Sequence, residues 1–315
     1  MFTLPTITGF FLDLIFGDPK YFPHPVKFFS FISKIFEKIF RKFIKNEIIS
    51  GFFFSIFISF TLFSLSFKFF SFLFEHNKFL YFFFSSFFIY TSIALKDLKD
   101  HTIPIYNSLK NKDIKKARFY LSRVVRRDTE NLDENEIIRA TIETISENTV
   151  DGIISPIFYS FIGGAPLCLL YKVVNTLDSM VGYKNERYKF FGLTSARFDD
   201  ILNFLPSRLS IFFISFSFFI YKRKGICAFK ISIRDGKKHP SPNSGYPESC
   251  YAGGFGIKLG GINYYNKVMN FKPYLGDEIE KLNLNHIIES LKITYLTSFI
   301  FLIFNFFVWD FLWKF

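Results

Sequence analysis

The stretch RATIETISENTVDGIISPIFYSFIGGAPLCLLYKVVNTLDSMVGYKNERYKFFGLTSARFDDILNFLPSR, residues 139–208, decides the fold of this chain. Acids, amides, glycines and arginines cluster here between apolar stretches, whereas Phe, Ile, Leu, Ser and Lys dominate elsewhere. Carboxylates beside membrane-like segments are costly to keep there, so these clusters are candidate functional sites. The three clusters are Glu143, Glu147 and Asp151 at helical spacing, then Asn175 with Asp178, then Asp199 and Asp200 with Asn203.

Over the whole chain, half of the 315 residues are hydrophobic, and several runs are long enough to be transmembrane helices, which need roughly 20 mostly apolar residues. The segment 153–171 is interrupted by proline and glycine, which predicts a re-entrant or discontinuous helix. The predicted fold is therefore an all-α polytopic membrane protein in one domain, with about four to six transmembrane or re-entrant helices. The candidate spans are 1–16, 51–74, 79–95, 153–171, 205–221 and 291–309.

The net charge of +12 comes mostly from basic runs that flank apolar segments, at 20–45, 110–127 and 222–238. This placement indicates the positive-inside pattern of a multi-pass protein in the cell membrane, with the lipid bilayer as a partner. Nucleic-acid binding is not expected, because no basic and aromatic recognition motif is present. Residues 28–47 read as a basic amphipathic helix on the cytoplasmic membrane surface. The N-terminus shows no cleavable signal pattern, and the oligomeric state stays open.

The membrane topology of residues 150–221 also stays open. If 153–171 does not cross the membrane and 205–221 does, the segments 96–200 and 222–290 face opposite sides. If both cross, those two segments share a side, and Asp178 to Asp200 lies on the other.

Three polar segments outside the central stretch are of interest. Asp13, Asp18 and His24 either end a helix or face a shared polar site. Residues 126–129 are a turn that could bind phosphate, and the DENE run after it predicts a helix start. The segment 234–261 reads as a glycine-rich loop able to approach a phosphate closely, although it is not a P-loop. The three cysteines and five histidines show no metal-ligand spacing.

Several motifs occur in a fixed order along the chain: GDP with PHPV (17–19 and 23–26), RDT (127–129), ENTVDGIISPIFY (147–159), NTLDSMVGYKNERY (175–188), the pattern FG--SAR-DD--N--P-R (191–208) and HPSPN-G-PES--AG (239–253). In this order they resemble the adenosylcobinamide-phosphate synthases of cobalamin biosynthesis, often labelled the CobD/CbiB family. The resemblance covers roughly residues 9–265.

The resemblance implies an amide-forming carbon–nitrogen ligase embedded in the membrane. Such an enzyme joins the f propionate of (adenosyl)cobyric acid, a corrinoid, to (R)-1-amino-2-propanol or its O-phosphate, with ATP as co-substrate and Mg²⁺. Carboxylates suit Mg²⁺, which prefers oxygen ligands and bridges to phosphates. Our hypothesis gives catalytic roles to Glu147, Asp151, Asp178 and Asp200, and metal binding to these four with Asp199.

Substrate or phosphate binding is expected from a third set: Asp18, His24, Arg127, Asn148, Asn175, Arg197, Asn203, Arg208, Ser241, Asn243 and Lys258. Without the resemblance, the residues leave two other classes open. A prenyl- or phosphoalcohol transferase would also use paired acids and Mg²⁺, but two DxxxD boxes are absent from the sequence. An ion-coupled transporter would use intramembrane acids and a broken helix.

Overall fold

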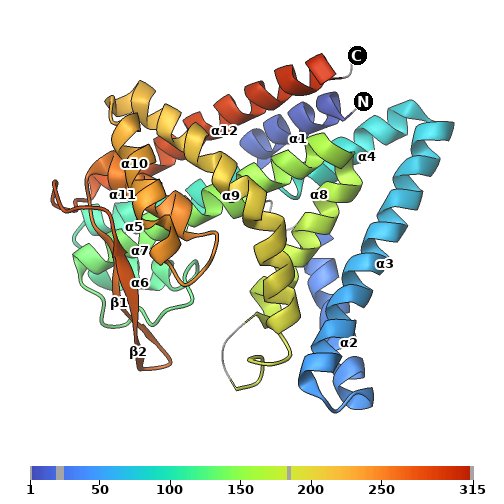
Figure 1. The fold of residues 1–315 in the computed structure, drawn as a ribbon, viewed down its shortest axis with the longest axis horizontal. Coiled ribbons are helices and arrows are strands. Elements are labelled where there is room, and N and C mark those ends of the chain that lie inside the picture. Colours follow the sequence, from blue (N-terminus) through green and yellow to red (C-terminus); the bar gives the residue numbers. More distant parts are fainter. Residues whose placement is uncertain (1, 19–24, 183–185, 313–315) are drawn as a thin grey trace. The chain divides into compact units, whose positions relative to one another are not determined.

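The computed structural model describes residues 2–18, 25–182 and 186–312, with side chains up to Trp309 (Figure 1). They are predominantly helical, and the long membrane helices confirm the predicted all-α polytopic class. The elements are α1 (Thr3–Phe16), α2 (Pro25–Phe43), α3 (Glu47–His76), α4 (Lys78–Tyr90), α5 (Leu95–Lys110), α6 (Ile114–Leu121), α7 (Glu134–Asn148), the π-helix η1 (Thr149–Ile154), α8 (Ser155–Val181), α9 (Leu193–Lys222), α10 (Gly225–Asp235), the 3₁₀-helix η2 (Gly236–Lys238), α11 (Gly245–Phe255), β1 (Leu259–Tyr265), β2 (Val268–Leu275) and α12 (Asn285–Leu312).

Contacts divide the chain into two compact units. The first unit contains Met1–Ala94, Ser155–Asn203 and Asn305–Phe315, and the second contains Leu95–Ile154 and Phe204–Phe304. Helices α9 and α12 each contribute to both units. The sequence's assignment of one synthase domain stays a prediction.

The first unit is built on α3 and α8, which pack against each other and against α2 and α4. Its core combines Phe54 and Ile58 of α3 with Val173 and Leu177 of α8, and Phe191 closes it. These helices are candidate membrane spans, so the cluster stabilises the unit through close van der Waals packing rather than through removal of apolar surface from water.

The second unit packs α11 against α10, with a buried hydroxyl network behind it. The Thr149 hydroxyl of η1 lies 3.1 Å from that of Tyr251 and 2.9 Å from that of Thr294. The hydroxyls of Tyr251 and Thr294 are 2.8 Å apart. These hydrogen bonds fix α11 and α12 against the end of α7, where the candidate site begins.

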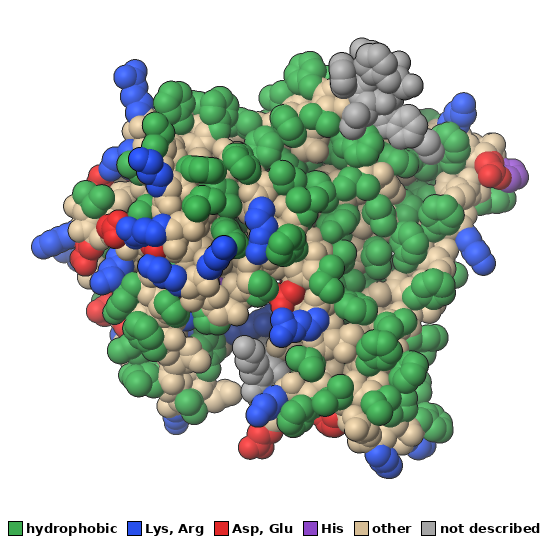
Figure 2. All heavy atoms as spheres, viewed as in Figure 1, with side chains coloured by type: hydrophobic (Ala, Val, Ile, Leu, Met, Phe, Trp, Pro, Cys, Tyr) green, Lys and Arg blue, Asp and Glu red, His purple; other side chains and the backbone are tan. Residues whose placement is uncertain are grey.

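Five helical segments of the described chain are long and apolar enough to cross a membrane. They are Glu47–His76, Lys78–Lys110, Glu134–Val181, Leu193–Lys222 and Asn285–Trp309. Many of their hydrophobic side chains are exposed, and Figure 2 shows such side chains spread over α3. An apolar exterior of this kind is what a lipid environment accepts and water does not.

Helix α8 confirms the prediction that segment 153–171 is discontinuous. Gly163 and Gly164 have non-helical backbone angles, and Gly164 has a φ of +64°. The preceding turn, η1, is a π-helix, a form that is frequent at functional sites. Whether the segment re-enters the membrane stays a prediction.

The segment 234–261 is more regular than predicted. Most of it is helical, and Gly253 and Gly254 lie inside α11 rather than in a loop. Each approaches a packed neighbour: a Cβ on Gly253 would lie 2.6 Å from Ile231. These glycines therefore permit tight helix packing, and the expectation of a loop was wrong there. Strands β1 and β2 form an antiparallel hairpin, the one sheet in the described residues.

Candidate functional site

Helix α7 positions two carboxylates one turn apart. Its start is fixed by a capping box, in which Asp133 accepts from the Glu136 N–H and Glu136 accepts from the Asp133 N–H. This confirms the helix start predicted from the DENE run. Glu143 is buried, and Glu147 is partly exposed. The helix therefore presents one enclosed and one accessible carboxylate.

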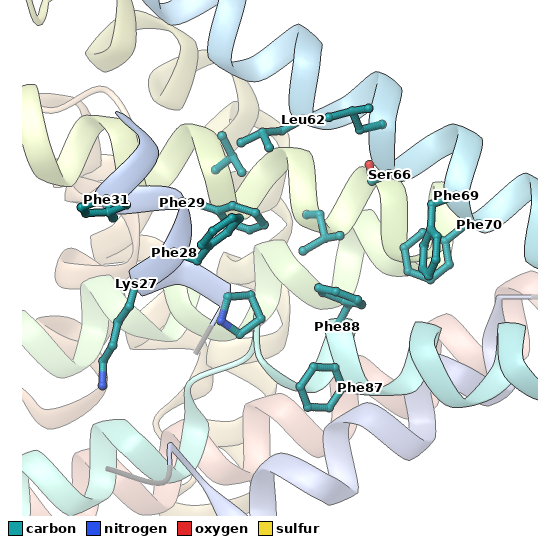
Figure 3. A pocket seen from close by; sticks show the side chains of 14 residues that line it. Lys27, Phe28, Phe29, Phe31, Leu62, Ser66, Phe69, Phe70, Phe87 and Phe88 are labelled. Atoms are coloured by element: carbon teal, nitrogen blue, oxygen red, sulfur yellow. The ribbon is translucent and has the colours of Figure 1, made fainter. Parts of the chain in front are cut away.

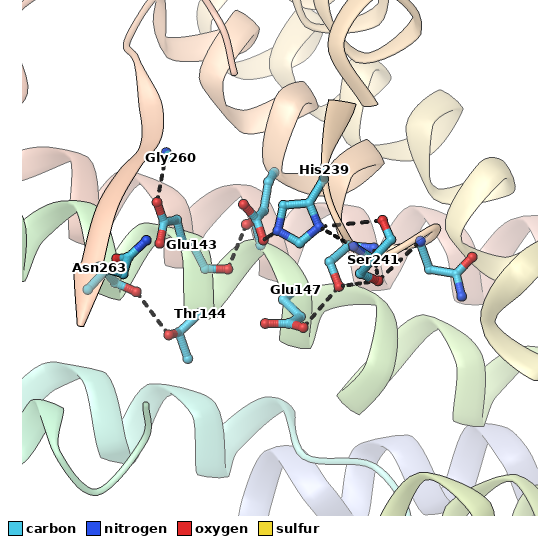
Figure 4. Close-up of polar contacts among 12 residues, drawn as sticks. Glu143, Thr144, Glu147, His239, Ser241, Gly260 and Asn263 are labelled. Atoms are coloured by element: carbon cyan, nitrogen blue, oxygen red, sulfur yellow. Dashed lines mark hydrogen bonds and ion pairs between the residues drawn. The ribbon is translucent and has the colours of Figure 1, made fainter. Parts of the chain in front are cut away.

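Glu143 belongs to a buried polar cluster that joins α7 to the hairpin (Figure 4). Arg127 forms an ion pair with Glu143, and its other terminal nitrogen donates to the Asn263 side chain. The N–H of Gly260 donates to Glu143 Oε1 at 2.9 Å. Arg139 donates to the carbonyls of Gly260 and Ile262. The sequence predicted that Arg127 binds a substrate anion, and in this structure it contacts protein groups.

The neighbouring Asp128 secures the tip of the hairpin. Its carboxylate accepts from the N–H groups of Asn266 at 3.2 Å and Lys267 at 2.6 Å. Its own N–H donates to the Tyr264 carbonyl at 2.8 Å. The RDT motif thus holds β1 and β2 against α7.

A tight turn at 239–244 meets Glu147 from the other side (Figure 4). The Ser241 hydroxyl accepts from the N–H groups of Asn243 and Ser244. The Ser244 hydroxyl donates to Glu147 Oε1 at 3.0 Å. The N–H of Ser241 donates to His239 Nδ1 at 3.0 Å. Ser241 thus shapes the turn that brings His239 and Glu147 to one place.

Three ionisable side chains have shifted pKa values here. Burial raises the pKa of Glu248 to about 8; the nearby carboxylates of Glu143 and Glu147 add to the rise, and Lys272 opposes it. Burial, together with the Lys272 charge, lowers the pKa of His239 to about 4. Burial alone would lower the pKa of Lys272, but the surrounding carboxylates, Glu248 foremost, raise it. At neutral pH the cluster therefore contains a charged lysine, a neutral imidazole and, in Glu248, a carboxyl whose pKa lies near neutral pH.

Arg208 contacts the same turn. Its guanidinium donates to Asn243 Oδ1 at 2.6 Å and to the Pro242 carbonyl at 2.9 Å. It also stacks on the rings of Phe204 and Tyr246. The Ser207 hydroxyl donates to Asn243 Oδ1 at 3.3 Å. Arg208 and Asn243 were both predicted to bind substrate, and here they hold each other and the turn.

A second polar group lies in the first unit. Asn203 Oδ1 accepts from Ser155 at 2.7 Å and from Tyr171 at 3.0 Å. The side-chain amides of Asn203 and Asn175 donate to the two oxygens of Asp199, at 3.0 and 3.2 Å. The charges of Asp178 and Asp200 act on Asp199 as well. Asn175 and Asp199, which belong to two separate clusters in the sequence, therefore lie together with Asn203 in the structure.

The other predicted residues are more dispersed. Arg197 pairs with Asp200 at 3.6 Å, and Lys258 lies over the ring of Tyr274. His24 falls outside the described residues. Asp18 is exposed, and its charge and that of Asp13 interact electrostatically with Tyr90. The Asn148 side chain donates to the Thr144 carbonyl. Asp151 is partly exposed on η1.

No three His, Cys, Asp or Glu side chains of the described chain converge as a metal-binding set. Mg²⁺, however, usually takes one or two carboxylates and completes its shell with water and substrate phosphates. The Asp199 carboxylate could supply one such oxygen, since the charges of Asp178 and Asp200 act on it and a bound cation would offset their repulsion. The structure thus fits a metal held partly by substrate.

An apolar cavity of about 860 Å³ lies elsewhere, within the first unit (Figure 3). It is lined by α2, α3, α4 and α8, and Lys27 and Ser66 are the polar residues among those that line it. Among the described residues, the lining contains no carboxylate and no histidine, and Lys27 is the ionisable side chain that it offers. The carboxylates and the imidazole that a polar reaction needs therefore lie in the polar clusters and not in this cavity.

The chain is similar in sequence to known proteins. The family model described as CobD/Cbib protein matches residues 6–294. This chain belongs to that family. A cobalamin biosynthesis protein CobD from Clostridium perfringens is 45% identical over 295 residues, which cover 93% of this chain and 94% of the relative. The proteins of the same name from Leptospira interrogans and Listeria monocytogenes are 42% and 39% identical. No solved structure matches.

Family membership confirms the resemblance drawn from the ordered motifs, but the motifs did not reveal the whole site. His239 and Glu248 lie inside the HPSPN-G-PES motif and were not selected, because a lone His or Glu in a turn-rich segment carries no distinct signal. Asn263 and Lys272 lie beyond the last motif, which ends at Gly253. Their role depends on the hairpin, which the sequence did not predict.

Proposed function

We propose that this member of the CobD/CbiB family acts in cobalamin biosynthesis as an amide-forming ligase of the cell membrane. It would join the f propionate of (adenosyl)cobyric acid to (R)-1-amino-2-propanol or its O-phosphate, using ATP. The product is (adenosyl)cobinamide or its phosphate.

The chemistry explains why such a site needs both cations and carboxylates. A carboxylate is a poor acylating agent, because an oxide would have to leave. Transfer of the γ-phosphoryl group of ATP gives an acyl phosphate, which the amine attacks with loss of phosphate. Cationic side chains stabilise the phosphate charge, and a carboxylate accepts the proton of the attacking ammonium.

One observation carries the proposal: the polar cluster of the second unit brings together motifs that are far apart in the sequence. Arg127 of RDT, Glu147 of ENTVDG, and His239 and Glu248 of HPSPN-G-PES meet there, and Lys272 joins them. The cluster contains cations, carboxylates and a neutral imidazole, and the side chains of Arg127, His239 and Glu248 are buried. This set suits binding of phosphate and of an amine at one place.

Mg²⁺ is part of the proposal. Asp199 and Asp178, together with Glu147, Asp151 and Asp200, remain the candidates to hold it. When bound, the metal would offset the negative charge of the phosphate groups. Asn175 and Asn203 already orient the carboxylate of Asp199 through hydrogen bonds.

The direct test is an assay of purified protein in detergent. Cobyric acid, Mg-ATP and either amino alcohol are supplied, and the corrin mass is followed. We expect a mass gain equal to amide formation, and its loss in Asp151→Asn. Asp100→Asn, a change at an exposed acid of α5, is the matched control and should react normally.

Two results would contradict the proposal. A folded protein that leaves the corrin unchanged with every amino alcohol would point instead to transport, which the broken helix α8 would suit. Transfer to a lipid acceptor would point to a membrane transferase.

A further inference from the structure

Two buried side-chain atoms near Glu147 have no hydrogen-bond partner among the described residues. They are Nε2 of His239 and Oε2 of Glu248. The Glu248 side chain is 1% exposed, and that of His239 is 5% exposed. A buried polar atom without a hydrogen-bond partner destabilises a fold, so such an atom is expected where it serves a function.

The geometry around His239 defines which atoms are available. Its Nδ1 accepts the N–H of Ser241, so in the neutral ring the proton lies on Nε2. Nε2 points toward Glu248 Oε1 at 3.6 Å, which is too long for a hydrogen bond. The two groups thus face each other without bonding, and Glu248 keeps an oxygen with no donor.

Burial opposes the charged form of Glu248, and charges of both signs act on it: Lys272 and Arg127 favour its carboxylate form, and Glu143 and Glu147 oppose it. Arg127 is already paired with Glu143, and Glu147 accepts from Ser244. Lys272 lowers the pKa of Glu248, whereas burial and the carboxylates of Glu143 and Glu147 raise it to about 8. A bound ammonium would favour the carboxylate form, which the Nε2–H of His239 could then stabilise.

We propose that Glu248 binds the ammonium group of the amine substrate and accepts its proton. This inference rests on the proposed ligase function and adds a catalytic residue to it. His239 is a positioning residue that stabilises the carboxylate through Nε2–H. Glu147, which is partly exposed, marks the solvent edge of the same site.

The proposed step balances as follows. The ammonium gives one proton to the Glu248 carboxylate and becomes a neutral amine. The amine nitrogen forms a bond to the acyl carbon, and the bond from that carbon to the phosphate oxygen breaks. The second nitrogen proton leaves with the phosphate, and Glu248 later returns its proton to solvent.

The experiment compares two nucleophiles in the full-length protein. The amino alcohol is an ammonium at neutral pH and needs a base. Hydroxylamine is largely unprotonated there and can trap the acyl phosphate without one, giving a corrin hydroxamate of distinct mass. Glu248→Gln removes the base and keeps the shape. Glu278→Gln changes an exposed acid and is the matched control.

In Glu248→Gln we expect kcat/KM for the amino alcohol to fall by about 100-fold or more, while hydroxamate formation stays within a few fold of wild type. Hydroxamate formation also reports that the variant is folded and binds ATP and the corrin. His239→Gln should give a smaller loss with the same selectivity for the amino alcohol.

Equal loss with both nucleophiles, or no loss with either, would overturn the role of Glu248 and leave the ligase function intact. If the wild-type protein yields neither the amide nor the ATP-dependent hydroxamate, the ligase function itself fails, and the inference falls with it.

Discussion

The Asp235 carboxylate is almost fully buried, and it holds the end of α10 to the start of the segment after β2. It accepts from Arg234 at 2.7 Å, Lys238 at 2.6 Å and the Gly276 N–H at 2.9 Å. Burial alone would raise the pKa of Asp235, but these donors outweigh burial and lower the pKa below its ordinary 3.8. The charged form therefore stabilises the fold.

We expect Asp235→Asn to destabilise the protein by about 2 kcal/mol at pH 7, because hydrogen bonds to a charged group are lost. The pKa is lowered in the folded state, so this contribution is complete above the ordinary pKa of 3.8 and declines as the pH falls below it. Thermal unfolding in detergent at pH 7 and at lower pH measures both effects. A difference between the two proteins that grows on acidification would contradict this account.

Asn203 connects three partners in the first unit. Asn203→Ala would leave the hydroxyls of Ser155 and Tyr171 without their acceptor, and we expect a loss of about 2–3 kcal/mol in the free energy of unfolding. Tyr171→Phe removes a single hydrogen bond and should cost about 1 kcal/mol. Equal costs in the two variants, measured by thermal unfolding, would show that Asn203 is not the centre of this group.

At the scale of elements, the start of α7 controls the placement of Glu143 and Glu147. We expect Asp133→Ala to destabilise the protein by about 1 kcal/mol, because the capping hydrogen bond is lost. Asp133→Asn keeps an oxygen acceptor and should be close to wild type. Thermal unfolding of the three proteins tests this, and an Asn variant as unstable as Ala would indicate that charge matters instead.

The hairpin turn is strained, since Asn266 and Lys267 have φ values of 51° and 64°. Lys267→Gly should stabilise the hairpin by about 1 kcal/mol, because glycine adopts this conformation without a Cβ clash. Slower hydrogen exchange of β1 and β2 amides would confirm it. Lys267→Ala keeps the Cβ and serves as the control, with exchange expected near that of wild type.

These two elements show what the sequence can and cannot reveal. The α7 start is a local signal, an acid with Glu three residues later, and it was predicted correctly. The hairpin was missed because Gly260 and Gly261 read as loop residues, and an Asn-Lys turn lacks the usual Asn-Gly signature. The contact between Gly260 and Glu143 spans more than a hundred residues, so no local pattern encodes it.

At the scale of the whole molecule, contacts within the first unit bear on topology. Arg187 pairs with Glu37 at 3.2 Å, and its carbonyl accepts from Arg41 at 2.8 Å. Arg187, which precedes α9, therefore lies beside the end of α2. If Glu47–His76 and Lys78–Lys110 both cross the membrane, the residues after Lys110 return to the side of α2, and segment 153–171 then does not cross.

We therefore expect cysteines placed at Lys42 and Glu186, both exposed, to react with an impermeant maleimide from the same side of sealed vesicles. The background protein carries Cys227→Ser, so the inserted thiol is the reactive one. Lysis with detergent gives the total labelling at each position. Labelling from opposite sides would mean that segment 153–171 crosses the membrane.

The distribution of the native thiols has a practical consequence. Cys168 and Cys250 are buried, whereas Cys227 on α10 is exposed. A thiol-reactive fluorophore should therefore attach once per folded chain, without engineering. Stepwise photobleaching of single detergent micelles or nanodiscs would then count the copies in each particle directly, one step per chain, and answer the question of stoichiometry that the sequence left open.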